Sequence, residues 1–248
     1  YPDEDRALLA CTTIPLRVRL AYGFLAREGM RAGEATALTW GDLDLERGAV
    51  RLDSNKTDEP RAWSLRPDVV RALRAWQKLS RTPVKDAQRT CLFPQDIRRA
   101  AELFRTHLQE AGITRPELFE RTPVRQPIRV HDLRATFVTI GLANGKTETW
   151  IADRTGHRSS IMINRYRRAA RSFCELGLGE LAPLDACIPE LAALAPSDGG
   201  DASPNTGAPE TDAPKTPLDP GTALVRSAPG VASGIEKACE TSVSAPLE

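Results

Sequence analysis

Residues 130–167 hold four side chains that could act on a phosphate diester: His131, Arg134, His157 and Tyr166. His131 and Arg134 are three positions apart, so they share one face if this stretch is a helix. A phenol can attack phosphorus, imidazoles can transfer protons, and guanidiniums can bind the non-bridging oxygens. This combination predicts attack on a phosphate diester without a metal ion.

The elements that must position these residues are expected to be mainly helical, because apolar residues recur at helical spacing before residue 175. Two helices are expected in residues 3–28, the first capped by Asp3 and the second opened by Pro15. Further helices are expected in residues 33–38, 96–111, 131–143 and 147–153. One more helix is expected to begin at Pro67, and a short one is expected to lead to Tyr166. Thr147 and either Ser159 or Ser160 are predicted caps, and Asn144-Gly145 a predicted end. The inward face of the 96–111 helix is predicted to carry Ile97, Leu103, Phe104 and Leu108.

A change of period predicts a small antiparallel sheet in residues 43–45, 49–53 and 62–65, with Lys56 at or near a hairpin. The expected fold class is therefore α+β, mainly helical, followed by a disordered tail. We expect a folded catalytic domain in residues 1–175 and a candidate docking segment in residues 176–195. Residues 196–248 are rich in Pro, Ala, Gly, Ser and Thr, and this composition is typical of disorder.

The formal net charge of +1 hides an asymmetry between the two parts of the chain. Residues 190–248 contain nine acids and three bases, a balance of −6, which leaves 31 bases and 24 acids, a balance of +7, before residue 190. Residues 121–171 alone contain eleven bases and three acids. A basic core of this kind favours a polyanionic partner, and a solvated basic surface is the alternative.

Other features exclude several classes of protein. No run approaches eighteen apolar residues and no signal-like leader is present, so we expect no membrane association and a cytoplasmic location. The five cysteines form no CxxC pair, which favours free thiols over disulfides or a zinc site. The sequence has no GxxxxGK[ST] loop and no carboxylate cluster for two magnesium ions, so neither a cofactor nor a metal is predicted. The first residue is Tyr1 rather than Met, which is expected either for a fragment that lacks its upstream part or for a processed amino terminus.

Four boxes in order resemble the catalytic domain of the tyrosine recombinases, the phage integrase family. The first is Glu28-Gly-Met-Arg31-Ala-Gly-Glu34 with the residues up to Asp44. The others are Asn55-Lys56-Thr57 with Arg61, His131-Asp-Leu-Arg134-Ala-Thr-Phe137, and Gly156-His157 with Tyr166 nine residues later. The resemblance covers about residues 3–171. It departs from the family pattern at Met30, Ala135 and Thr155, the last of which stands where an apolar residue is usual.

The resemblance implies functional roles for six positions, Arg31, Lys56, His131, Arg134, His157 and Tyr166, with Glu34 as the acidic residue behind the first arginine. Arg31 and Arg134 would stabilise the charge on the phosphate, and Tyr166 would form a 3′-phosphotyrosyl intermediate. His131 is the first choice to accept the phenol proton, with His157 donating to the phosphate and Lys56 protonating the departing 5′ oxygen.

The implied activity is site-specific recombination of double-stranded DNA, by a homotetramer on DNA that is a monomer or weak oligomer without it. A type IB topoisomerase, which uses the same intermediate but rejoins the original ends, is one alternative. A DNA-binding accessory module with decayed catalysis is another. The apolar segment 176–194 either packs on its own domain or docks into a neighbouring protomer.

Overall fold

The computed structural model describes residues 1–53, 60–80, 89–98 and 101–194, and the account below concerns these residues. Lys56 lies outside them, as do the tail from residue 195 and the fifth cysteine, Cys239. Within the described part of the chain, no helix is both long and apolar enough to cross a membrane.

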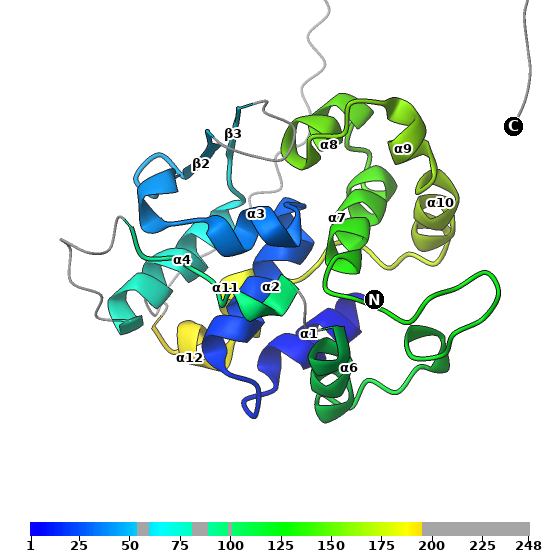
Figure 1. Ribbon diagram of the computed structural model, residues 1–248, viewed down its shortest axis with the longest axis horizontal. Coiled ribbons are helices and arrows are strands. Elements are labelled where there is room, and N and C mark those ends of the chain that lie inside the picture. The colour runs from blue at the N-terminus through cyan, green and yellow to red at the C-terminus, as the bar shows by residue number, and fades with distance from the viewer. Residues whose placement is uncertain (54–59, 81–88, 99–100, 195–248) are drawn as a thin grey trace, which may run out of the picture. The chain divides into compact units, whose positions relative to one another are not determined.

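Helix α2 (Leu16–Glu28) is the centre of the fold, and every residue from Arg19 to Glu28 is buried. Pro15 precedes its first turn, where the fixed φ of proline favours helix initiation. A helix that is buried on all sides needs neighbours around it. Figure 1 shows it surrounded by helices, and it contacts α1 (Pro2–Ala10), α3 (Ala32–Ala37), α4 (Pro67–Ser80) and α7 (Asp132–Ala143).

A three-stranded antiparallel sheet follows α3 and the 3-10 turn η1 (Trp40–Asp42). Its strands, in spatial order, are β1 (Leu43–Asp44), β2 (Ala49–Leu52) and β3 (Arg61–Ser64). Val50 pairs with Trp63, and both are buried, because alternate residues of each strand face the core. Leu52 at the end of β2 pairs with Arg61 at the start of β3, so the strand ends that flank residues 54–59 lie side by side.

The remaining helices form two groups. One comprises η2 (Asp96–Arg98), α6 (Ala101–Glu110), which contacts η2, and η3 (Pro116–Leu118), and the other comprises α7, α8 (Glu148–Thr155), α9 (Ser160–Asn164) and α10 (Arg167–Glu175). The second group has its own small apolar cluster of Phe137, Val138, Ile151 and Ile163, with Tyr166 packed against it. Helix α7 joins the two parts, because it contacts both α2 and α10.

The segment after α10 returns to the main core as α11 (Leu184–Cys187) and α12 (Pro189–Ala192). These helices contact α4, and α11 also contacts α1 and α2 (Figure 1). Leu184, Ile188 and Leu191 are at most 1% exposed. In this chain, therefore, the apolar part of the segment covers its own domain.

The expected fold class is confirmed, as is the cap at Thr147, whose hydroxyl accepts a hydrogen bond from the Trp150 amide. Two local expectations are wrong. The first helix begins at Pro2 with Tyr1 as its cap, not at Asp3, because proline favours the first helical position. Leu103, predicted to face inward, is 42% exposed, because neighbouring Phe104 fills the core position.

Candidate active site

The turn between α2 and α3 positions the first arginine. Gly29 ends α2 with a φ of 68°, and a Cβ atom there would lie 2.3 Å from the Phe137 ring, so only glycine lets α2 approach α7 this closely. Arg31 follows as the N-cap of α3. Its Nη2 donates to the Gly156 carbonyl over 3.2 Å, and this bond ties the first box to the third.

Glu34 binds two arginines of the candidate site, Arg31 and Arg61. Its Oε1 lies 2.7 Å from Arg31 Nη1 and 2.8 Å from Arg61 Nη2, and its Oε2 accepts from the Arg31 amide. Burial alone would raise the pKa of Glu34, but the hydrogen bonds from Arg31 and the charges of Arg61 and Arg31 lower it overall. Glu34 is therefore an ionised carboxylate shared by two guanidiniums.

Arg134 is the buried arginine of the candidate site, at 5% exposure. Its Nη1 donates to the Gly29 carbonyl over 2.8 Å, and its Nη2 lies 3.1 Å from Nε2 of His157. Burial and then the charge of Arg31 lower its pKa to about 10. Among the described residues, no carboxylate forms an ion pair with Arg134. Its hydrogen-bond partners are neutral dipoles, and Glu34 acts on it electrostatically without pairing with it. A bound anion would therefore stabilise its charge.

His157 has partners on both ring nitrogens. Since a guanidinium can only donate, Nε2 accepts from Arg134. On the other side, Nδ1 lies 2.9 Å from the hydroxyl oxygen of Thr155. Burial, and then the charges of Arg134 and Arg31, lower the pKa of His157 to about 4. The imidazole is therefore neutral at pH 7.

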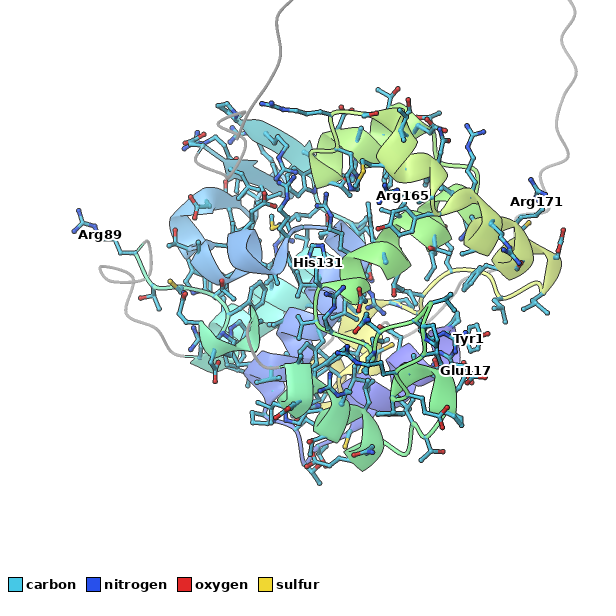
Figure 2. All side chains as sticks on the ribbon, turned by 45° about the vertical axis from the view of Figure 1, so that its right-hand side comes forward. Tyr1, Arg89, Glu117, His131, Arg165 and Arg171 are labelled. Atoms are coloured by element: carbon cyan, nitrogen blue, oxygen red, sulfur yellow. The ribbon has the colours of Figure 1, made fainter. Side chains whose placement is uncertain are left out.

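His131 and Tyr166 lie at the starts of two helices of the second group. His131 is the exposed N-cap of α7 (Figure 2), and burial and then the charge of Arg134 lower its pKa. Tyr166 is the half-buried N-cap of α10. It interacts electrostatically with Arg134, and within the described part of the chain its hydroxyl makes no hydrogen bond. The phenol is thus near the buried guanidinium without being held by it.

Hydrogen bonds link Arg134 to His157 and Arg31 to the neighbouring Gly156, and both His131 and Tyr166 interact electrostatically with Arg134. The sixth predicted site residue, Lys56, lies outside the described residues. Sequence reasoning assigned no role to Arg61, which stands on the strand after the hairpin. Arg61 binds Glu34 and donates to the Arg154 carbonyl over 2.7 Å, and its side chain is 8% exposed. Its position after the hairpin lysine was the available signal, but its contacts depend on tertiary packing.

The protein surface beside these residues is open and basic. A groove of about 690 Å³ is lined by β3 and by the end of α8, including Arg61, Arg154 and His157. Arginines 165, 168 and 171 are exposed along the α9–α10 edge, where Figure 2 labels Arg165 and Arg171. This surface could bind a polyanion.

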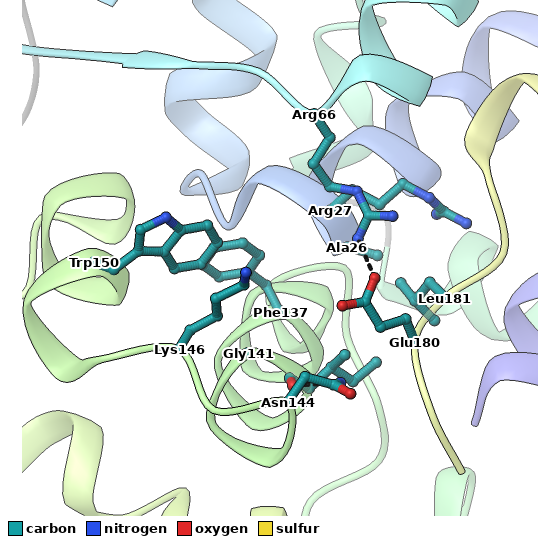
Figure 3. Close-up of a pocket in the computed structure, with 11 residues that line it drawn as sticks. Ala26, Arg27, Arg66, Phe137, Gly141, Asn144, Lys146, Trp150, Glu180 and Leu181 are labelled. Carbon is teal, nitrogen blue, oxygen red and sulfur yellow. Dashed lines mark hydrogen bonds and ion pairs between the residues drawn. The ribbon is translucent and has the colours of Figure 1, made fainter. Parts of the chain in front are cut away.

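A second pocket is lined by none of the candidate site residues. Figure 3 shows it between Trp150 and Lys146 on one side and the Arg66–Glu180 ion pair, 3.9 Å long, on the other. Trp150 stacks on Phe137, with ring centroids 5.6 Å apart. The volume of this second pocket is about 40 Å³, which is too small for a substrate. Among the described residues, no cluster of three or more His, Cys, Asp or Glu side chains could hold a metal.

Solved recombinases share this fold. The structure titled "Crystal structure of XerA recombinase" matches with a TM-score of 0.55 and 24% identity, over 73% of this chain and 63% of that one. A XerH site-specific recombinase in a post-cleavage complex with a palindromic difH substrate matches with a TM-score of 0.51 and 22% identity, over 71% of this chain and 51% of that one.

The family follows from the sequence. The model of the phage integrase family matches residues 2–172, and the chain belongs to this family. The protein named "Putative integrase/recombinase y4eF" from Sinorhizobium fredii (strain NBRC 101917 / NGR234) is 28% identical over 68% of this chain and 63% of its own length. Its relative y4qK from the same strain is 27% identical over 68% of this chain and 51% of its own length. The chain thus spans less than two thirds of these relatives, and the resemblance predicted from the motifs is confirmed.

Proposed function

We propose that this chain is the catalytic part of a site-specific DNA recombinase of the integrase type, which cuts and rejoins strands through a 3′-phosphotyrosyl intermediate. The observation that carries the proposal is the buried guanidinium of Arg134, which has no carboxylate partner among the described residues and lies near Tyr166. A phosphate diester would supply the missing negative charge beside the nucleophile.

In the cleavage step, Arg31 and Arg134 bind the non-bridging oxygens, and Tyr166 Oη attacks phosphorus as the bond to the 5′ oxygen breaks. Glu34 keeps Arg31 in place through two hydrogen bonds, so the guanidinium is oriented before the substrate arrives. Because Tyr166 has no hydrogen bond to break within the described part of the chain, its phenol can turn toward the phosphorus.

The histidines differ in the proton that each can move. His131 is exposed and its pKa is lowered, so at pH 7 it is a neutral base that can accept the phenol proton. His157 accepts from Arg134 at Nε2 and must gain a proton there before it can donate to the phosphate. The negative charge of a bound diester favours that proton, because it raises the pKa of a nearby imidazole.

The leaving 5′ oxygen takes its proton from Lys56 in this proposal. A 5′-hydroxyl from another strand then attacks the phosphotyrosine and regenerates the phenol. One ester replaces another in each step, so the reaction needs no cofactor, metal or nucleotide energy source. The proposed substrate is double-stranded DNA, which fits the basic surface of the α9–α10 edge.

The architecture proposed for the whole protein has further parts. Residues 1–175 form the catalytic domain, and residues 196–248 are an acidic tail. Residues 176–195 are a candidate docking segment, which would have to leave the surface of its own domain, where α11 and α12 pack here. Because the curated relatives are longer than this chain, we propose a DNA-clamping domain upstream. On DNA the protein would assemble as a homotetramer, and without it as a monomer or weak oligomer, in the cytoplasm.

The covalent intermediate provides the test. A library of nicked duplexes with randomised sequence would release a short fragment after cleavage and so trap the adduct, whose DNA can be sequenced to find the target. We expect a denaturant-resistant adduct with the wild type and with Tyr1→Phe, a matched control at an exposed tyrosine. Tyr166→Phe should abolish it, and an adduct that survives this change would remove Tyr166 from the mechanism.

A plasmid assay separates the alternatives. Exchange of strands between two sites supports recombination, whereas relaxation of supercoils without exchange would favour a type IB topoisomerase. Salt-sensitive DNA binding without any adduct would favour a decayed accessory module.

A further inference from the structure

Thr155 stands where the family pattern has an apolar residue, and its hydroxyl contacts His157. It is the last residue of α8 and is 0% exposed. Its hydroxyl lies 2.6 Å from the Ile151 carbonyl one turn back and 2.9 Å from Nδ1 of His157. A buried hydroxyl with two partners of different type limits which partner can donate.

The protons in this chain of contacts can be assigned. The Ile151 carbonyl can only accept, so the single hydroxyl proton of Thr155 is donated to it. The Thr155 oxygen is then left as an acceptor, and the bond to His157 requires a proton on Nδ1. At the other nitrogen, Arg134 can only donate, so Nε2 carries the lone pair. Two contacts from different helices therefore specify the same tautomer.

We propose that Thr155 is a positioning residue that holds His157 in the Nδ1-protonated tautomer, so that Nε2 is the nitrogen that meets the phosphate. The catalytic part of this inference rests on the proposed function, whereas the tautomer does not. The Thr155 acceptor keeps Nδ1 protonated in both charge states of the ring. Any proton that His157 gains or loses is then exchanged at Nε2, beside Arg134.

The surroundings of His157 make this tautomer matter. The charged and titratable groups that interact with it are Arg134 of α7, Arg31 before α3, His131 at the start of α7 and Arg61 of β3. The ring is half-buried among these positive charges and is neutral at pH 7, so one nitrogen lacks a proton. With the opposite tautomer, Nε2–H would point at the guanidinium of Arg134, and Arg134 would lose this acceptor.

The chain offers a direct spectroscopic test, because it contains only three histidines. Nitrogen-15 spectra of the imidazoles at pH 7 report which nitrogen carries the proton, and His131→Gln and His157→Gln variants assign the signals. For His157 we expect a protonated Nδ1 that exchanges slowly with water, in the wild type and in Thr155→Ser, which keeps the hydroxyl. Thr155→Val has nearly the same shape without the acceptor, and it should lose the slow exchange and show a mixture of tautomers.

Thr155→Ala removes the same acceptor and replaces the valine variant if that one does not fold, as judged by thermal unfolding. An unchanged tautomer and unchanged exchange in the folded valine or alanine variant would overturn the inference. The nicked-duplex assay provides the second readout. Adduct formation should slow about tenfold without the hydroxyl, as expected for the loss of a hydrogen bond to a group that becomes charged, and recover with serine.

The two proposals can fail separately. If no protein forms an adduct but the tautomer changes as described, the recombinase assignment fails and the role of Thr155 in holding the ring remains. If all variants form the adduct at the wild-type rate with the wild-type tautomer, the assignment remains and the role of Thr155 is lost. Adduct formation that slows with valine but does not recover with serine would also contradict the positioning role.

Discussion

Two groups of arginines, one on α2 and one in the candidate site, are compensated differently. Arg19 and Arg27 are each 1% exposed, and each faces carboxylates. In the pocket, Arg31 and Arg61 share a single carboxylate, Glu34, and within the described residues Arg134 faces none. The first group is neutralised by the protein itself, whereas the second has an excess of positive charge.

The neutralised group holds the ends of the domain together. Arg27 lies 2.8 Å from Asp5 of α1 and 3.5 Å from Asp68 of α4, and it donates to the Ala182 carbonyl over 2.6 Å. Arg19 binds Glu190 of α12 in the same way, at 2.5 Å. These contacts join the first and last described helices, so we interpret this group as structural.

Arg134 is hydrogen-bonded to neutral dipoles, whereas Arg19 and Arg27 pair with carboxylates. Arg134 donates to a carbonyl and to an imidazole lone pair, and its pKa is lowered, which means that its charge is destabilised. The comparison teaches that a buried arginine without a carboxylate is the better indicator of an anion site.

The largest effect on stability is expected at Arg27. Arg27→Met leaves Asp5 and Asp68 without their buried partner, which should lower the free energy of unfolding by about 3–5 kcal/mol. Urea denaturation measures it. The adduct yield per folded molecule should stay at the wild-type level, and a loss of chemistry without a loss of stability would contradict the structural interpretation.

Arg134→Gln is expected to have the opposite effect, a loss of chemistry without a loss of stability. Removing one donor to a developing oxyanion should slow adduct formation by about 100- to 1000-fold. The free energy of unfolding should stay equal or rise, because an uncompensated buried charge is removed. Single-turnover cleavage of the nicked duplex and urea denaturation are the two measurements, and a variant that is strongly destabilised would break the comparison.

A third prediction concerns Glu28, a buried carboxyl between the two groups. Burial raises its pKa to about 7, although Trp63 and the Arg66 amide donate to it. Because the folded state holds this proton more tightly than the unfolded state, wild-type stability should decrease as the pH rises from about 4.5 through about 7. Glu28→Gln stays neutral, so its stability relative to the wild type should increase across this window.

The change between the usual value of 4.5 and about 7 corresponds to about 3 kcal/mol at the upper end of the window. Urea denaturation of both proteins at pH 5 and pH 8 measures it. A difference between the two proteins that does not depend on pH would show that Glu28 titrates normally.

The smallest effect is expected at the surface. Arg167 binds Glu148, and its side chain is 64% exposed, so Arg167→Ala should change the free energy of unfolding by less than about 0.5 kcal/mol. If Arg167 contacts a phosphate, the slope of DNA affinity against salt should decrease by about one. Fluorescence titrations at several salt concentrations provide the slope, and an unchanged slope would leave Arg167 as a solvated charge.

Much of the fold could be predicted from local pattern. The apolar spacing of α7, the caps at Thr147 and Ser159 and the three short strands follow from contacts between near neighbours in the chain. The error at Leu103 has the same origin, because spacing indicates a face of a helix but not how wide the buried stripe is.

The candidate site, too, could be predicted in part from local motifs, and the rest depends on tertiary contacts. The motifs named the six candidate residues, and the family follows from the sequence alone. The roles of Arg61 and Thr155 could not be predicted, because both depend on how distant segments meet. Arg31 reaches the Gly156 carbonyl across 125 positions of sequence, and Arg134 reaches the Gly29 carbonyl across 105.

By itself, then, the sequence determined the family, the helical pattern and the chemical types of the candidate groups. Only the tertiary structure decided which arginines are neutralised and which nitrogen of His157 carries its proton. The physical reason is that charge compensation and proton position depend on distances of about 3 Å between atoms from different elements. Packing of the whole core sets those distances, and no local spacing contains them.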